Sequence, residues 1–152
     1  MNIVLVEPEI PQNTGNVSRT CALTRCRLHL VKPLGFSIDD RQLKRAGLDY
    51  WEYVDLVLWD SFEELVNNHR GSRFFLATTK AGQRYDRQQY NDDDFIVFGK
   101  ETKGLPAEIL AMFPDSQIRI PMHDLGRSLN LSNSVAIVLF EALRQQDFPN
   151  LL

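Results

Sequence analysis

The sequence predicts an α/β fold, in which a mostly parallel sheet carries helices on both faces. Short apolar segments rich in β-branched residues recur along the 152 residues, and segments with helical spacing or helix caps lie between them. Strands that alternate with helices are typical of a parallel sheet that is covered on both sides. No internal repeat, linker or low-complexity tract interrupts this pattern, so we expect one domain over residues 1–152.

The expected strands are short and apolar, as buried parallel strands are. Pro121 ends the last of them. The segment Ala81–Asp94 is polar without a clear period, and we expect a loop there with room for one turn of helix. The expected strands cover Asn2–Val6, Leu28–Val31, Val54–Trp59, Phe74–Thr78, Phe95–Phe98 and Ile118–Met122.

Caps and stop signals define the expected helices. Asn13 or Thr14 precedes a helix over Gly15–Thr24, and Ser61 begins a segment with capping-box spacing. The last helix starts near Leu131, and its apolar positions cover more than one stripe, so we expect it to be buried on most sides. The candidate caps of this last helix are Ser132, Asn133 and Ser134, and the other expected helices cover Asp39–Ala46, Ser61–Asn68 and Pro106–Met112.

The charge of the chain restricts its partners. A formal net charge of −3 argues against a protein that coats DNA through a generally basic surface. RNA binding through a local patch remains open. The local basic clusters are Arg25 with Arg27, and Arg41 with Lys44 and Arg45, although such clusters are usually solvated faces.

The cysteines and the N-terminal segment bear on the cellular compartment. Cys21 and Cys26 have no histidine nearby at ligand spacing, so we expect buried thiols and not a zinc site or a disulfide. No apolar run is long enough to span a bilayer. A strand pattern begins at Asn2 with no signal or transit peptide before it, so we expect a cytoplasmic location and no membrane partner.

The common ligand and catalytic motifs are absent from the sequence. It holds no GxGxxG, Walker A, HExxH or GxSxG motif and no Cys/His metal set, so we expect no metal cofactor. His29 falls inside a predicted strand and is expected to be a packed residue. His123, in a polar loop, is the histidine of greater interest.

Three polar loops follow predicted strands. The first holds Asn13 and, one turn further along, Arg19; the second contains Gly99, Glu101 and Gly104. The third is Arg127-Ser128-Leu129-Asn130. Ligands of parallel sheets bind outside the carboxyl ends of the strands. We therefore expect the loops after Val6, Thr78, Phe98 and Met122 to meet in one region.

Each polar loop also has a simpler explanation when it is taken alone. The run from Ser128 to Ser134 is explained by helix capping, and glycines such as Gly99 and Gly104 are common in tight turns. Glu101 is compatible with a solvated carboxylate, the usual state of a glutamate. The joint placement of the three loops on one sheet edge is what favours a ligand site.

Together the loops resemble the SPOUT class of RNA methyltransferases. The resemblance rests on Asn13, Gly15-Asn16 and Arg19, on FGxExxGLP over Phe98–Pro106, and on IPM and SLNxSNSxA between Ile120 and Ala136. It extends over all 152 residues. The opening EPEIPxNTGN, the segment RAGLDYW and the short chain are similar to the tRNA wobble-nucleotide (cytidine or uridine 34) 2′-O-methyltransferases of that class.

This resemblance implies a C-terminal trefoil knot, a homodimer and S-adenosylmethionine as cofactor, with S-adenosylhomocysteine as product. The substrate that it implies is the anticodon loop of tRNA, not DNA. The implied cofactor-binding residues are Ala77, Thr78, Gly99, Glu101, Gly104, Ile120, Met122, Ser128 and Leu129. The implied catalytic residues are Asn13, Arg19, Glu101, Ser128 and Asn130, and the candidates for the RNA backbone are Arg25, Arg41, Lys44 and Arg45.

The roles of these residues follow from their chemistry. A guanidinium is almost always charged, so Arg19 is expected to hold an RNA phosphate and stabilise a developing alkoxide, not to act as a base. Glu101 is expected to orient Arg19 or to bind the nucleotide. Ser128 and Asn130 are expected to fix the ribose or the methionine end from the helix N-terminus.

Three alternatives remain open from the sequence. The first is 2′-O-methylation of another tRNA position or of ribosomal RNA, because the residues that read the target base do not form a recognisable motif. A non-catalytic RNA- or nucleotide-binding module on the same fold is a second alternative, since a fold alone does not define an activity. A phosphate-acceptor regulator needs clustered acidic residues at strand ends, and Pro8 separates the only candidates, Glu7 and Glu9.

Overall fold

The computed structural model describes residues 1–38, 50, 53–124, 126–149 and 151–152. The expected helix Asp39–Ala46, with Arg41, Lys44 and Arg45, lies outside the described residues. The described strands are β1 (Asn2–Val6), β2 (Arg27–Val31), β3 (Leu56–Trp59), β4 (Phe74–Ala77), β5 (Gln83–Arg84), β6 (Phe95–Phe98) and β7 (Gln117–Arg119). The described α-helices are α1 (Pro11–Thr24), α3 (Phe62–Asn68), α4 (Ala107–Met112) and α5 (Leu131–Gln145), with 3₁₀ turns at Tyr85–Arg87 and Pro114–Ser116.

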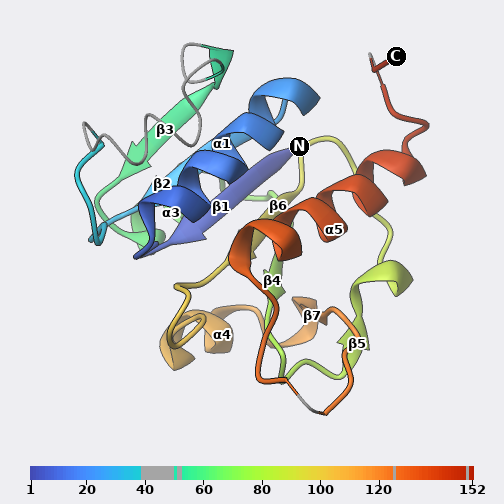
Figure 1. Cartoon of the computed structure of the whole chain (residues 1–152). Helices are drawn as coiled ribbons and strands as arrows, with labels where there is room; N and C mark the ends of the chain where they lie inside the picture. Colours follow the sequence, from blue (N-terminus) through green and yellow to red (C-terminus); the bar gives the residue numbers. More distant parts are fainter. Residues whose placement is uncertain (39–49, 51–52, 125, 150) are drawn as a thin grey trace.

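The described strands form one parallel sheet in the order β3-β2-β1-β6-β4-β7-β5 (Figure 1). Successive side chains of β1 point to opposite faces, as strand geometry requires. Ile3 and Leu5 pack in a core cluster with α1 and α5, whereas Val4 and Val6 pack in a second cluster with α3 and α4. The predicted α/β fold with helices on both faces is confirmed.

Helix α1 begins four residues earlier than predicted. It starts at Pro11, with Ile10 as its N-cap, so Asn13 and Thr14 lie inside the first turn and are not caps. Proline is favoured at the first helical position because its fixed φ suits the helix and its missing N–H has no partner there anyway. The predicted start at Gly15, with Asn13 or Thr14 as the cap, was wrong.

Helix α5 differs from the prediction in its cap and in its burial. Asn130 is the N-cap, and its side-chain oxygen accepts hydrogen bonds from the backbone N–H groups of Ser132 and Asn133. The expected caps at Ser132, Asn133 and Ser134 were wrong. The helix is also not buried on most sides, because Ile137 is 36% exposed and Phe140 is 47% exposed.

Two segments near the pocket edge of the sheet also differ. Strand β7 ends at Arg119, three residues before the predicted end, and the chain continues as a loop through Pro121. The segment Ala81–Asp94 contains the expected turn of helix and, in addition, the two-residue strand β5, which pairs with β7. Both residues of β5 are exposed, so no apolar pattern marks this strand in the sequence.

The cysteines behave as predicted. Cys21 and Cys26 are free and buried, and burial raises the pKa of both thiols. None of the helices in the described part of the chain is long and apolar enough to cross a membrane.

His29 is the packed residue that the sequence predicts. It is fully buried in β2, where Trp59 Nε1 donates to His29 Nδ1 at 3.0 Å and Asn2 Oδ1 lies 3.2 Å from His29 Nε2. The Trp59 bond requires an unprotonated Nδ1, so Nε2 carries the proton and donates to Asn2. Burial, followed by the nearby charges of His69 and Arg27, lowers the pKa of His29 to about 4.

This shift predicts a loss of stability at mildly acidic pH. An unfolded histidine has a pKa of 6.5, so between that pH and about 4 the unfolded chain binds more protons at His29 than the folded protein does. The free energy of unfolding therefore falls as the pH is lowered through this window, by about 3 kcal/mol from this one group. Urea unfolding at several pH values, compared with the variant His29→Gln, measures the contribution. If the free energy of unfolding depends on pH identically in the wild type and in His29→Gln, His29 does not make this contribution.

Candidate active site

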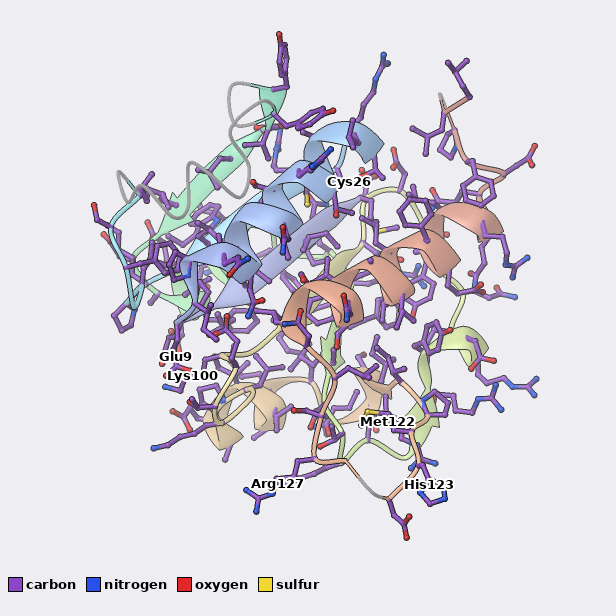
Figure 2. The ribbon with its side chains drawn as sticks, viewed as in Figure 1. Glu9, Cys26, Lys100, Met122, His123 and Arg127 are labelled. Atoms are coloured by element: carbon purple, nitrogen blue, oxygen red, sulfur yellow. The ribbon has the colours of Figure 1, made fainter. Side chains whose placement is uncertain are left out.

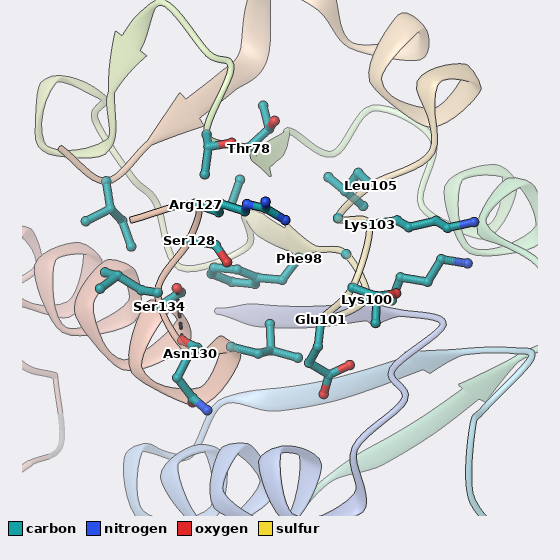
Figure 3. Close-up of a pocket in the computed structure, with 18 of the residues that line it drawn as sticks. Thr78, Phe98, Lys100, Glu101, Lys103, Leu105, Arg127, Ser128, Asn130 and Ser134 are labelled. Atoms are coloured by element: carbon teal, nitrogen blue, oxygen red, sulfur yellow. Dashed lines mark hydrogen bonds between the residues drawn. The ribbon is translucent and has the colours of Figure 1, made fainter. Parts of the chain in front are cut away.

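The loops predicted to meet at the carboxyl edge of the sheet do meet there. They surround a cavity of about 460 Å³. Its walls come from Ile10 and Asn13 after β1, from residues 77–80 at the end of β4, from residues 98–105 at the end of β6, and from Ile120, Met122 and residues 127–131 after β7 (Figure 3). The nine residues that the resemblance assigns to the cofactor all line this cavity: Ala77, Thr78, Gly99, Glu101, Gly104, Ile120, Met122, Ser128 and Leu129.

Glu101 joins the loop after β6 to the start of α1. Its carboxylate accepts hydrogen bonds from the backbone N–H groups of Glu9 (2.8 Å) and Ile10 (3.2 Å) and from Asn13 Nδ2 (3.0 Å). A helix N-terminus has unpaired N–H groups and partial positive charge, which a carboxylate satisfies. The simpler reading of Glu101 as a solvated carboxylate was therefore wrong.

A chain of hydrogen bonds then extends from Glu101 through two other residues that line the pocket. Asn13 donates to Glu101, and its Oδ1 accepts a hydrogen bond of 3.0 Å from Asn130 Nδ2. The other end of the Asn130 side chain caps α5. Three of the five predicted catalytic residues thus form one network that fixes α1, α5 and the loop after β6 relative to one another.

A second set of polar contacts holds the same two loops together. Glu9 Oε2 accepts hydrogen bonds from Thr102 N (3.1 Å) and Thr102 Oγ1 (2.8 Å), and Lys100 Nζ lies 2.6 Å from Glu7 Oε2. The hydrogen bond from Thr102 is the main cause that lowers the pKa of Glu9. Glu7 adopts a left-handed backbone with φ of 50°. No local sequence pattern indicates these contacts, because they join residues 93 positions apart.

Gly99 allows the loop after β6 to fold back on itself. A Cβ atom at this position would lie 2.1 Å from the carbonyl carbon of Gly104 and 2.2 Å from the nitrogen of Leu105. Gly104 has φ of 69°, in the left-handed region that favours glycine. The two glycines are therefore required by the conformation of this pocket wall.

Arg19 lies outside the network. It is exposed on α1, and its guanidinium carbon lies 4.9 Å from the centre of the Tyr50 ring, within the range of a cation–π contact. The hydrogen bonds of the Glu101 carboxylate go to Glu9, Ile10 and Asn13 at the start of α1. The structure therefore does not support the prediction that Glu101 orients Arg19. Ser128 is exposed and lines the cavity next to Asn130.

Arg25 does not lie near the cavity. It is the C-cap of α1, at the far end of a helix of 14 residues that starts beside the pocket, so about 20 Å separates the two ends. Its sequence neighbour Arg27 is held 2.6 Å from Asp55. The structure instead brings to the pocket three exposed basic residues that were not predicted to bind RNA: Lys80, Lys103 and Arg127.

The described residues contain no cluster of His, Cys, Asp and Glu side chains that is suited to hold a metal ion. The cavity therefore offers backbone groups, apolar walls such as Leu105 and Ile118, and the amide network. This combination suits an organic ligand with polar edges.

Solved structures similar to this one include RNA methyltransferases. One, titled as structural insights into the 2-OH methylation of C/U34 on tRNA, is 44% identical to this chain with a TM-score of 0.92, covering 96% of this chain and 95% of that one. The AdoMet-bound rRNA methyltransferase from Sinorhizobium meliloti shares the fold at 24% identity with a TM-score of 0.84, over 94% of this chain and 55% of that one.

The family follows from the sequence as well. The model of the SpoU rRNA Methylase family matches residues 1–140, and the chain belongs to this family. A relative from Methylovorus glucosotrophus (strain SIP3-4) bears the name tRNA (cytidine(34)-2'-O)-methyltransferase. It is 53% identical over 148 residues, which cover 97% of this chain and 96% of the relative. The predicted resemblance to RNA methyltransferases is confirmed.

Proposed function

We propose that this protein transfers the methyl group of S-adenosylmethionine to the ribose 2′-hydroxyl of the wobble nucleotide, cytidine or uridine 34, of tRNA. The near full-length match to relatives with that name carries the proposal. The joint presence of Asn13, Glu101 and Asn130 in one hydrogen-bonded network at the cavity favours an enzyme over a binding module.

The cavity fits the cofactor. Leu105, Ile118 and Ile120 supply apolar surface for an adenine ring, while the loops around Thr78 and Gly99 bring main-chain groups to the same space. The residues that would hold S-adenosylmethionine are the nine cavity residues that the resemblance assigns to it. When bound, the cofactor supplies a methyl group that is already activated by its sulfonium.

The protein's own contribution is positioning. The acceptor hydroxyl must lie behind the methyl group at near-attack distance, with water excluded. Asn130 is held by α5 and by Asn13, so it presents a fixed polar group at the pocket edge, and Ser128 lies beside it. Glu101 acts by fixing the start of α1, and through it Asn13.

Arg19 is proposed to bind the RNA phosphate beside the target ribose and to stabilise the developing alkoxide. Its place on α1, six residues after Asn13, leaves its guanidinium exposed for this contact, and the Tyr50 ring supports it from one side. Arg25 and the residues Arg41, Lys44 and Arg45 remain proposed contacts to the RNA backbone.

A homodimer and a C-terminal trefoil knot complete the proposal. Leu23 on α1 and Ile137 and Phe140 on α5 are exposed apolar side chains on two helices that pack together, which supports an interface between copies there. The trefoil knot is proposed from the resemblance to the SPOUT class.

Labelled S-adenosylmethionine tests the proposed function. The protein is incubated with bulk tRNA, and separately with ribosomal RNA, from cells that lack the gene, and labelled nucleotides are mapped by mass spectrometry. We expect a 2′-O-methyl group at the wobble ribose of tRNA. Label in ribosomal RNA alone, or cofactor binding without any transfer, contradicts the proposal.

Arg19→Ala is expected to lower the rate of methyl transfer by about 100-fold or more, because removing one preorganised donor to a developing anion has an effect of that order. The dissociation constant of S-adenosylmethionine should change by less than about threefold, since Arg19 lies outside the cofactor cavity. Arg70→Ala, an exposed arginine beyond α3, serves as the matched control. Equal losses in turnover and cofactor affinity count against the assigned role.

A further inference from the structure

Three cations at the mouth of the cavity have no role in the proposed chemistry. Lys80 follows β4, Lys103 lies in the loop after β6, and Arg127 lies in the loop before α5. All three are exposed and line the cavity. Figure 3 shows Lys103 and Arg127 coming from opposite sides of the pocket, and in Figure 2 the side chain of Arg127 projects away from the ribbon. We call these three residues the basic rim.

Among the described residues, none of the basic-rim side chains is held in an ion pair, although the charge of Lys103 contributes to lowering the pKa of Glu9. Lys100, the fourth cation of the cavity, is instead held by Glu7 at 2.6 Å. The carboxylates of Glu9 and Glu101 are directed to other partners. Glu9 accepts two hydrogen bonds from Thr102, and Glu101 accepts hydrogen bonds at the start of α1, so neither forms an ion pair with the basic rim.

The proposed cofactor does not explain this charge. S-adenosylmethionine carries a sulfonium and an ammonium against a single carboxylate, so a ring of cations around its pocket is electrostatically unfavourable. The chain as a whole has a net charge of −3, so a local excess of positive charge stands out from the rest of the surface. The rim instead complements a polyanion that reaches the cavity from solvent.

We propose that Lys80, Lys103 and Arg127 bind the phosphates of the RNA strand on either side of the target ribose. This inference rests on the proposed function and assigns it an RNA-binding surface beyond the basic clusters of the sequence. Each ribose in RNA is flanked by phosphates, so a nucleotide whose hydroxyl enters the cavity brings two anions to its mouth. The guanidinium of Arg127 suits bidentate phosphate contact, and the two ammonium groups act as point charges.

Salt-dependent tRNA binding tests the basic rim. Fluorescence anisotropy with tRNA from cells that lack the gene is measured over a series of KCl concentrations for Lys103→Ala, Arg127→Ala and the double variant. Each lost phosphate contact should weaken binding about fivefold near physiological salt and lower the slope of log affinity against log salt by about 0.7 to 0.9. The double variant should bind about 25-fold more weakly, if the two contacts are independent.

Control variants and cofactor titrations separate phosphate binding by the basic rim from cofactor binding and from a general effect of surface charge. Arg127→Lys keeps the charge and should keep most of the salt slope, and Arg70→Ala removes an exposed charge elsewhere and should leave tRNA affinity unchanged. Cofactor affinity, measured by calorimetry, should stay within about twofold in every rim variant, since no rim residue is assigned to the cofactor. A parallel loss of cofactor affinity would assign the rim to the cofactor carboxylate and overturn the inference.

tRNA binding by the rim variants and the position of the methyl group test the RNA-binding inference and the proposed function separately. If the wild-type protein methylates tRNA while the double variant binds tRNA with unchanged affinity and salt slope, the inference is wrong and the function stands. If the wild-type protein binds tRNA through the rim but modifies another nucleotide, the proposed position is wrong and the rim stands.

Discussion

Glu101→Ala is expected to abolish measurable methyl transfer and to lower the free energy of unfolding by about 2 kcal/mol. The substitution leaves the partly buried Glu9 N–H and Asn13 amide without their acceptor, at about 1 kcal/mol each, whereas the exposed Ile10 N–H can bond to water. The start of α1 then loses one of its ties to the loop after β6, and Asn13 loses the bond to Glu101 that orients it toward Asn130. Thermal unfolding and single-turnover methyl transfer measure the two effects.

Two variants make this prediction specific. Glu101→Gln keeps one acceptor oxygen but places an NH₂ group against one of the donors, so an intermediate loss is expected. Glu63→Ala removes an exposed carboxylate from the first turn of α3, and both stability and activity should remain near those of the wild type. A Glu101→Ala protein with wild-type turnover would show that the network is not needed for the reaction.

Gly99→Ala is expected to remove cofactor binding. The new Cβ would lie 2.1 Å and 2.2 Å from backbone atoms of Gly104 and Leu105, and backbone atoms cannot rotate away as the end of a flexible side chain does. The loop must open, which displaces the cavity wall that carries Glu101 and Lys103. We expect cofactor affinity to fall by more than about 100-fold, with a loss of stability of about 1 to 3 kcal/mol.

The chain contains a matched control for this substitution. Gly126 lies in the loop before α5, its backbone is not in the left-handed region, and an added Cβ would meet no atom within 4 Å. Gly126→Ala should therefore bind the cofactor like the wild type in isothermal titration calorimetry. Wild-type affinity in Gly99→Ala would contradict the close approach of the two backbone segments.

The sequence was sufficient for most of the sheet and for the place of the pocket. Apolar runs such as Phe95–Phe98 mark central strands because they are buried on both faces, and Ser61 marks the start of α3 because its hydroxyl accepts from Glu64 N. The pocket followed from topology, since loops at the carboxyl ends of parallel strands share one edge.

The errors have identifiable physical causes. Asn130 and the three polar residues within the next four positions all have side chains that favour N-caps, so composition could not select the one that caps α5. Strand β5 has two residues, both exposed, and its pairing with β7 leaves no trace in hydrophobic spacing. The contacts of Glu101 and Glu9 join segments about 90 residues apart, and spacing within one loop carries no information about them.

Methyl transfer to a tRNA that lacks one hydroxyl tests whether the wobble 2′-hydroxyl is the acceptor. A tRNA is assembled with a 2′-deoxynucleotide at position 34 only, and its labelling by the wild-type protein is compared with that of the same tRNA carrying a ribonucleotide there. Our account predicts transfer to the ribonucleotide form and none to the deoxynucleotide form, with cofactor affinity unchanged. Equal labelling of the two tRNAs would contradict methylation of the wobble 2′-hydroxyl.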